Sequence, residues 1–294
     1  VNYIFVDAEK KLEMSLNNDS NVLEYFGIFS NLLTKNIKHI EYGNISAACT
    51  HVVKKSTYHE YKPNDLTVEA AWTFISNHFK GLSGKKMAII GGGNIGFKLA
   101  LKLVESGVSV EFVRRSMEKG KLLVDAIDTI KPISTLATAH YNSNPIKASI
   151  ECDALIGVTN GKDAISWEMI QSMKPDGIVV DIGKGTINKS VVEKAILKGI
   201  NVIRCDVSAA LSGVISTIIK NIDISQNKMG RAEATKGINI VSGGQFALEG
   251  DVIVDNINNP KNIYGISNGE GDIVIKIDNR QKAIISEIET FIEK

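Results

Sequence analysis

The sequence predicts an α/β protein built on a doubly wound parallel sheet, and three observations support this prediction. A buried strand, a glycine-rich turn and a helix follow one another within residues 85–105. Further apolar strand segments alternate with helical segments as far as residue 204. With 294 residues and 44% hydrophobic side chains, the chain is long enough for two domains. Strands and helices that alternate at this spacing typically form a parallel sheet with helices on both faces.

The first part of the chain predicts a second, smaller α/β domain. Its expected elements are a strand at 2–7, an amphipathic helix at 21–35 and a strand at 37–42. A weakly periodic segment at 44–61 follows, and the turn Lys62-Pro63-Asn64-Asp65 then starts a helix at 67–79. We expect the domain boundary at this turn, with a substrate domain at 1–65.

A glycine-rich turn follows the buried strand that ends at Ile90. The residues that carry its Gly-x-Gly-x-x-Gly pattern are Gly91, Gly93 and Gly96. The first glycine allows a sharp turn, the second lets a diphosphate approach the backbone, and the third lets helix and strand pack closely. The helix that starts at Asn94 and Ile95 would offer its N–H groups and positive dipole end to the phosphates. Such a turn can also bind nothing, but a second strand at 108–113 completes a unit of roughly 30 residues, which favours dinucleotide binding.

The alternation of elements continues beyond this unit and then loosens. The next expected elements are a helix at 117–130, strands at 133–141, 153–159 and 177–182, a helix at 188–198 and a strand at 201–204. After these come an expected helix at 207–221, a strand at 238–241, two apolar runs of open type at 251–257 and 272–277, and an amphipathic helix at 281–293. We expect the last helix to pack back on the first domain. The cofactor domain would then span 66–244, and residues 245–294 would return to the substrate domain.

Composition and charge exclude several classes of protein. The formal net charge of +1 and the absence of like-charged blocks disfavour a nucleic-acid partner. No apolar run approaches the roughly 18 residues of a membrane span, and the N-terminus lacks a secretory signal. Three widely separated cysteines disfavour disulfides, and no spacing of His, Asp or Glu predicts a metal site. We expect a cytoplasmic homodimer that binds a small molecule, although the start at Val1 leaves open that an upstream segment has been removed.

The end of the second strand indicates which dinucleotide is bound. A strand of this kind usually ends in an acid that binds the ribose 2′-OH of NAD. Here it ends in Val113-Arg114-Arg115-Ser116, where two guanidinium groups and a hydroxyl would suit a 2′-phosphate. These residues therefore predict NADP, with NAD still possible and FAD disfavoured. The alternative is that both arginines lie on an ordinary solvated strand end.

Three motifs give the chain a resemblance to known enzymes. They are Leu82–Lys86 before the glycine turn, Cys152–Gly161 and Met173–Gly183. Residues 67–206 resemble the cofactor domain, a Rossmann fold, of two-domain dehydrogenases. Methylenetetrahydrofolate dehydrogenase, shikimate dehydrogenase, alanine dehydrogenase and the NAD-containing S-adenosylhomocysteine hydrolase belong to this group.

The resemblance implies roles for two loops of the cofactor domain. The loop with Thr159, Asn160 and Gly161 would lie under the adenosine and ribose, and the loop that starts at Gly183 would approach the nicotinamide. The pattern at 113–116 is most like that of shikimate dehydrogenase, which implies NADP. The motifs specify the fold well and the substrate poorly.

The expected sheet brings these segments to one edge. In an open parallel sheet, ligands bind beyond the carboxyl ends of the strands at the switch point. The segments that would end strands there are 91–96, 114–116, 159–161, 183–185 and Asp206. We expect the substrate between this edge and the first domain.

Candidates for the catalytic group are less specific. Hydride transfer needs a residue that exchanges a proton or stabilises developing charge. Lys184, between two glycines after the fifth strand, could reach the nicotinamide, and an exposed loop lysine is an equally good interpretation. His51 and Lys54 lie where a substrate loop is expected, although single polar loop residues are more often merely exposed. Asp206 is compatible with a catalytic or a structural role.

These observations leave three hypotheses about function. The first is an NADP-preferring oxidoreductase that moves a hydride to or from a small polar metabolite in an interdomain cleft. The second is an enzyme that keeps NAD bound and uses transient oxidation for a hydrolase or lyase reaction. The third is a protein that binds or senses the dinucleotide without chemistry.

Overall fold

The computed structural model describes residues 2–9, 11–12, 43–235 and 237–293. The helix and strand expected at 21–35 and 37–42 lie outside the described residues. The chain divides into two compact units, Val1–Val214 and Ile215–Lys294, which are described separately below.

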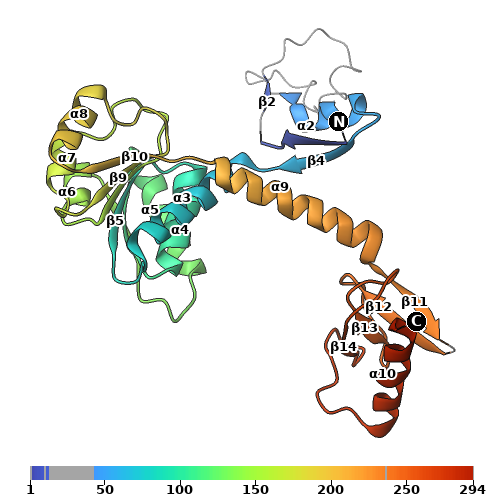
Figure 1. Cartoon of the computed structure of the whole chain (residues 1–294). Coiled ribbons are helices and arrows are strands. Elements are labelled where there is room, and N and C mark those ends of the chain that lie inside the picture. Colours follow the sequence, from blue (N-terminus) through green and yellow to red (C-terminus); the bar gives the residue numbers. More distant parts are fainter. Residues whose placement is uncertain (1, 10, 13–42, 236, 294) are drawn as a thin grey trace. The chain divides into compact units, whose positions relative to one another are not determined.

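A six-stranded parallel sheet is the centre of the first unit (Figure 1). Its strands are β5 (Lys86–Ile90), β6 (Ser109–Val113), β7 (Ala139–Asn142), β8 (Ala154–Gly157), β9 (Ile178–Asp181) and β10 (Asn201–Arg204). They lie in the order β10-β9-β8-β5-β6-β7, and every neighbouring pair is parallel. This is the strand order of a doubly wound dinucleotide-binding domain, with its switch point between β5 and β8. The predicted fold class is confirmed.

Helices cover both faces of this sheet (Figure 1). They are α3 (Pro63–Phe79), α4 (Asn94–Glu105) and α5 (Met117–Ile130) on one face, and α6 (Pro145–Ser149), α7 (Trp167–Gln171) and α8 (Lys189–Leu197) on the other. Alternate residues of β5 serve the two faces: Met87 and Ile89 pack in the core under the first three helices, and Ala88 and Ile90 in the core under the others. A strand buried on both faces is a continuous apolar run, as the sequence predicts.

The N-terminal part of the first unit has a small sheet of its own. Strand β1 (Tyr3–Asp7) pairs in parallel with β4 (Thr57–Tyr61), and β2 (Lys11–Leu12) pairs antiparallel with β3 (Gly43–Asn44). Helix α2 (Ile45–Val52) precedes β4. The segment at 44–61 is therefore largely regular, although its sequence shows only weak periodicity. Since β4 is partly exposed, it lacks the apolar run of a central strand.

The second unit has a mixed four-stranded sheet. Helix α9 (Ser208–Asp223) crosses the boundary between the units and continues into a π-helical turn, η2 (Ile224–Lys228). The strands are β11 (Gly230–Thr235), β12 (Ile238–Ser242), β13 (Val252–Val254) and β14 (Ile263–Ile266), in that order. Helix α10 (Asn279–Ile292) ends the chain, and its Ile288 is buried with Ile240, Val252 and Ile266.

The C-terminal helix thus differs from its expected place. Helix α10 contacts β11 and β14 of its own unit, so it does not form a domain with the N-terminal segment as we expected. The physical reason is that the apolar face of α10 has an apolar sheet nearby in the chain to cover. The boundaries expected at 65 and 244 stay a prediction, while the six-stranded sheet itself ends with β10.

No helix in the described part of the chain is both long enough and apolar enough to cross a membrane.

Candidate functional site

The turn after β5 has the geometry that a dinucleotide-binding turn requires. Gly91 has a φ of 122°, a conformation that favours glycine, and its N–H donates to the Val113 carbonyl oxygen at 3.0 Å. A Cβ on Gly91 would lie 2.6 Å from the carbonyl carbon of Val158. A side chain at this position would therefore separate β5 from the loop after β8.

The other two glycines of the pattern differ in their surroundings. A Cβ on Gly96 would overlap the carbonyl oxygen of Gly91, so this glycine lets α4 pack against the turn. A Cβ on Gly93 would meet nothing within 4 Å, which means that the protein alone does not require glycine there. Asn94 and Ile95 are the first residues of α4, and the N–H groups at a helix start have no intrahelical partner. The open space and these donors fit the diphosphate of a dinucleotide.

The loops after β8 and β9 lie against each other at the switch point. Thr159 accepts a hydrogen bond from the Gly161 N–H through its Oγ1 at 3.0 Å, which closes the first loop, and Asn160 lies exposed between them. A Cβ on Gly183 would lie 3.0 Å from the carbonyl carbon of Thr159. The loops with Thr159 and Gly183 therefore approach each other through their backbones, next to the glycine turn.

The arginines at the end of β6 have different environments. The guanidinium of Arg114 donates to the carbonyl oxygen of Gly92 in the glycine turn, so this side chain lies over the turn. Arg115 is exposed. Ser116 caps α5, where its hydroxyl accepts from the Lys119 N–H at 3.4 Å. Two guanidinium groups and a hydroxyl thus stand at the expected ribose position, without a carboxylate at the strand end.

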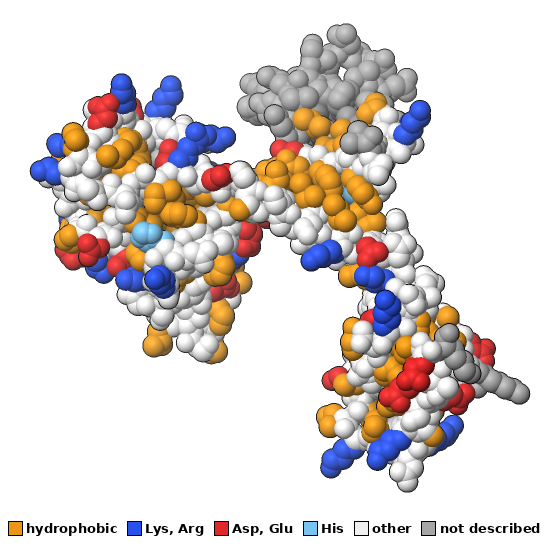
Figure 2. Space-filling view, viewed as in Figure 1, with side chains coloured by type: hydrophobic (Ala, Val, Ile, Leu, Met, Phe, Trp, Pro, Cys, Tyr) orange, Lys and Arg blue, Asp and Glu red, His pale blue; other side chains and the backbone are white. Residues whose placement is uncertain are grey.

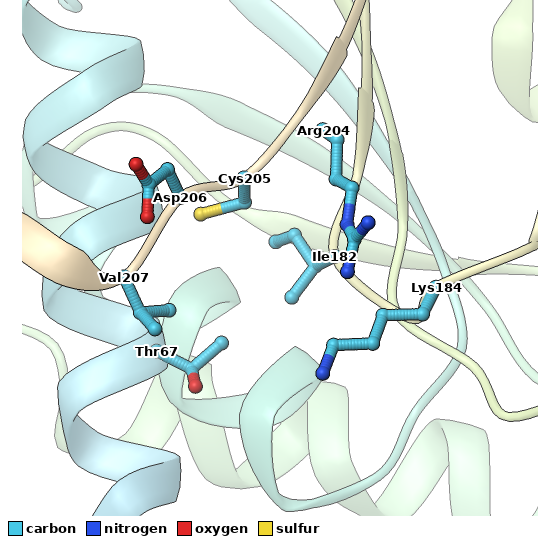
Figure 3. Close-up of a pocket in the computed structure, with 7 residues that line it drawn as sticks. All are labelled: Thr67, Ile182, Lys184, Arg204, Cys205, Asp206 and Val207. Carbon is cyan, nitrogen blue, oxygen red and sulfur yellow. The ribbon is translucent and has the colours of Figure 1, made fainter.

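A hollow of about 410 Å³ opens at the carboxyl ends of β9 and β10, beside the start of α3 (Figure 3). Its lining residues are Thr67, Ile182, Lys184, Arg204, Cys205, Asp206 and Val207. In Figure 3, Lys184 and Arg204 enter the hollow from one side, and Thr67 and Val207 lie on the other. The structure therefore brings together Lys184 and Asp206, two of the four predicted catalytic residues, and adds a second cation.

The loop that carries Lys184 is held by Asp181, the last residue of β9. One carboxylate oxygen of Asp181 accepts from the Gly185 N–H at 2.9 Å, and the other accepts from the Thr186 hydroxyl at 2.7 Å. Lys184 has a φ of 61°, a left-handed conformation that a lysine rarely adopts. Asp181 thus restrains the position of the lysine. The sequence analysis missed this role, although an acid at a strand end before a glycine-flanked lysine was a visible signal.

Asp206 has a structural task at the start of α9. Its carboxylate accepts from the Ser208 N–H at 2.9 Å and from the Ser208 hydroxyl, and these hydrogen bonds lower the pKa of Asp206. In Figure 3 the carboxylate points away from Lys184 and Arg204. Asp206 is therefore an ionised group at the rim, while desolvation by burial raises the pKa of the neighbouring Cys205 thiol. Such a thiol remains protonated at neutral pH.

The other two catalytic candidates lie in the N-terminal part of the unit. His51 belongs to α2, and Lys54 follows that helix as an exposed residue. Neither is among the residues that line the hollow. Their roles stay predictions.

Within the described residues, no group of three or more His, Cys, Asp or Glu side chains is placed to hold a metal ion.

The six-stranded sheet and its glycine turn define the first unit as the nicotinamide dinucleotide-binding domain of a dehydrogenase. The family model of the "D-isomer specific 2-hydroxyacid dehydrogenase, NAD binding domain" matches residues 56–207, just over half of the chain. The chain belongs to this family. The resemblance to two-domain NAD(P)-dependent Rossmann dehydrogenases is thus confirmed for the cofactor domain, and the cofactor is a nicotinamide dinucleotide.

Solved structures of low sequence identity are also similar to the chain. Dipicolinate synthase from Bacillus halodurans is 15% identical, with 55% of this chain and 58% of that chain covered and a TM-score of 0.40. Shikimate dehydrogenase from Aquifex aeolicus is 16% identical, with coverages of 51% and 52% and a TM-score of 0.38. The pyruvate reductase of Chlamydomonas reinhardtii is 16% identical, with coverages of 54% and 51% and a TM-score of 0.37. The chain thus spans less than two thirds of each. No curated protein matched the sequence.

Proposed function

We propose that the protein is an NADP-preferring oxidoreductase that interconverts a small 2-hydroxy acid and the corresponding 2-oxo acid. The family of its cofactor domain supports this reaction type. The observation that carries the proposal is the pair of cations, Lys184 and Arg204, in the hollow beside the Gly183 loop. Two cations suit a substrate with a carboxylate next to a carbonyl oxygen, since one can bind the carboxylate while the other stabilises the developing charge.

The proposed roles of the residues follow from their positions. The bound nicotinamide supplies or accepts the hydride at the substrate carbon. In the reducing direction Lys184 donates a hydrogen bond and then a proton to the carbonyl oxygen, and it recovers that proton from solvent. Arg204 binds the carboxylate. Asp206 remains ionised beside them and orders the start of α9, which makes a role as proton donor unfavourable at neutral pH.

The preference for NADP rests on the residues after β6. Arg114 already reaches the glycine turn through its hydrogen bond to the Gly92 carbonyl, and Arg115 is exposed beside it. A 2′-phosphate at this point would meet two guanidinium groups. The ribose of NAD would find no carboxylate there to accept from its 2′-OH.

The test is an assay with a panel of small 2-oxo acids and either NADPH or NADH. We expect NADPH-dependent reduction of at least one acid, and Lys184→Gln should lower kcat by roughly 100-fold or more, as loss of a positioned acid does. Lys198→Gln, which alters an exposed lysine beyond α8, is the matched control and should keep its activity. Nicotinamide absorbance that survives desalting would instead favour the enzyme with tightly bound NAD. Dinucleotide binding without turnover on any substrate would favour a sensing role.

We also propose that the protein forms a homodimer through α9. None of the side chains of this helix is buried, and Figure 2 shows apolar side chains gathered over it. Large aliphatic residues recur at alternating intervals of four and three residues, at Leu211, Ile215, Ile218 and Ile222. This spacing is typical of helices that pair along a continuous seam, and a second copy would present the same seam. A cytoplasmic location, an interdomain cleft and roles for His51 and Lys54 stay predictions.

A further inference from the structure

A second hollow lies wholly within the C-terminal unit. It has a volume of about 800 Å³ and lies where η2, the ends of β12 and β13, and the loop before β14 meet. This volume is within the range of small-molecule sites in proteins, roughly 300 to 1,000 Å³. None of the residues of the proposed active site lines it.

The hollow combines an apolar surface with a polar rim. Val254 is buried beneath it, and Ile224 and Tyr264 add partly exposed apolar surface. Glycine is required at Gly243, since its φ is 68° and a Cβ there would lie 2.6 Å from the Cα of Met229. The β12 end thus approaches the end of η2 through bare backbone, which leaves room for the hollow beside it.

The rim loop at 255–262 is held in one shape by its own hydrogen bonds. Asp255 accepts from the backbone N–H groups of Lys261 and Asn262, at 2.8 and 3.1 Å, and from the Asn262 side-chain amide at 3.0 Å. The Asn258 amide donates to the Asn227 carbonyl at 2.8 Å, and this contact ties the loop to η2. The carboxylate of Asp255 is therefore fully used in building the rim.

Several side chains of the lining are not used in this way. Within the part of the chain that the structure describes, no side-chain hydrogen bond or ion pair is found for Asn221, Asn259, Lys261 or Tyr264. Lys228, by contrast, pairs with Asp223 at 2.7 Å. The hollow thus offers two amides, one phenol and one ammonium. An amide both donates and accepts hydrogen bonds, as a ligand hydroxyl does.

We propose that this hollow binds a saccharide. Ring hydroxyls would pair with the amides of Asn221 and Asn259, and the apolar face of the sugar would lie against the ring of Tyr264, whose apolar body and polar tip suit such a ligand. A compact phosphate fits less well, because Lys228 is already neutralised by Asp223. The site is therefore distinct in position and chemistry from the proposed hydride-transfer site.

Saturation-transfer NMR on the full chain tests the proposal, with glucose, galactose, N-acetylglucosamine and glucuronate as probes and inorganic phosphate as a comparison. We expect at least one sugar to receive saturation from the protein. Asn259→Ala and Tyr264→Phe remove one hydrogen-bonding group each and should weaken binding roughly three- to tenfold. Asn77→Ala, an exposed asparagine on α3, is the matched control and should bind as the unaltered chain does.

The outcomes separate this proposal from the proposed function. A thermal unfolding curve and NADPH binding would show that each variant folds. Failure of all four sugars to bind, binding of phosphate alone, or sugar binding that neither variant weakens would overturn the proposal. None of these results would affect the assignment of the hydride-transfer site, which depends on other residues.

Discussion

The substitution Gly93→Ala separates cofactor binding from folding. A Cβ at this position meets nothing within 4 Å, and the residue has a φ of −84° and a ψ of −167°, which alanine adopts without strain. Alanine is a poorer helix N-cap than glycine but also restricts the unfolded chain, and the two effects are of similar size. We therefore expect the free energy of unfolding to change by about 1 kcal/mol or less.

The effect on the cofactor should be much larger. The space above Gly93 is where a diphosphate would approach the start of α4, so a methyl group there displaces it from the helix N–H groups. A hydrogen bond to a charged group contributes about 1.5–3 kcal/mol. Its loss corresponds to a rise in Kd of roughly 10- to 150-fold for both NADPH and NADH. Fluorescence titration with each nucleotide measures this change.

The substitution Gly96→Ala is the matched comparison. A Cβ at Gly96 overlaps the Gly91 carbonyl oxygen, so α4 must shift, and we expect a loss of stability of about 1–3 kcal/mol. Thermal denaturation should therefore show a lower Tm for Gly96→Ala than for Gly93→Ala. An unchanged nucleotide Kd in a folded Gly93→Ala variant would refute the reasoning, because the diphosphate would then lie elsewhere.

Three further predictions concern charge, pH and association. Arg114→Glu should raise the Kd for NADPH by roughly tenfold or more while that for NADH changes little; equal losses would remove the argument from a 2′-phosphate. Burial raises the pKa of Asp153, but hydrogen bonds from the Lys86 N–H and Lys174 outweigh it and hold that pKa below its ordinary value. This carboxylate therefore stabilises the fold above its unfolded pKa of about 3.9, and the contribution is lost as the pH falls through the folded pKa. Asp153→Asn should lower Tm at neutral pH and flatten its fall in acid, and an unaltered profile would contradict the assignment. Ile218→Glu should convert a homodimer to monomers in light scattering, whereas Ser216→Glu, at an exposed position of the same helix, should not.

The cofactor domain was predictable because its signals are local. An apolar run that is buried on both faces, followed by three glycines at fixed spacing, allows few alternatives to a strand, a turn and a helix. The alternation that follows then implies the parallel sheet. The structure confirms this part, and a Cβ on Gly91 or Gly96 would meet neighbouring backbone, as their predicted roles require.

The C-terminal unit was harder to predict because its signals are weak. The run at 251–257 contains only a three-residue strand, Val252–Val254, and its pattern alone did not distinguish strand from helix. The destination of α10 depended on which apolar surface lay nearest in space. A sequence pattern shows that a helix has an apolar face but not what covers that face.

By itself, the sequence determined the α/β class, the dinucleotide turn and the arginines after β6, because these follow from contacts between residues that are near one another in the chain. Only the tertiary structure decided that Arg204 joins Lys184 in one hollow, that Asp181 holds the lysine loop, and that α10 closes a separate sheet. The last two strands and the start of α3 are distant in the chain. Their side chains meet because parallel strands bring their carboxyl ends to one edge of the sheet.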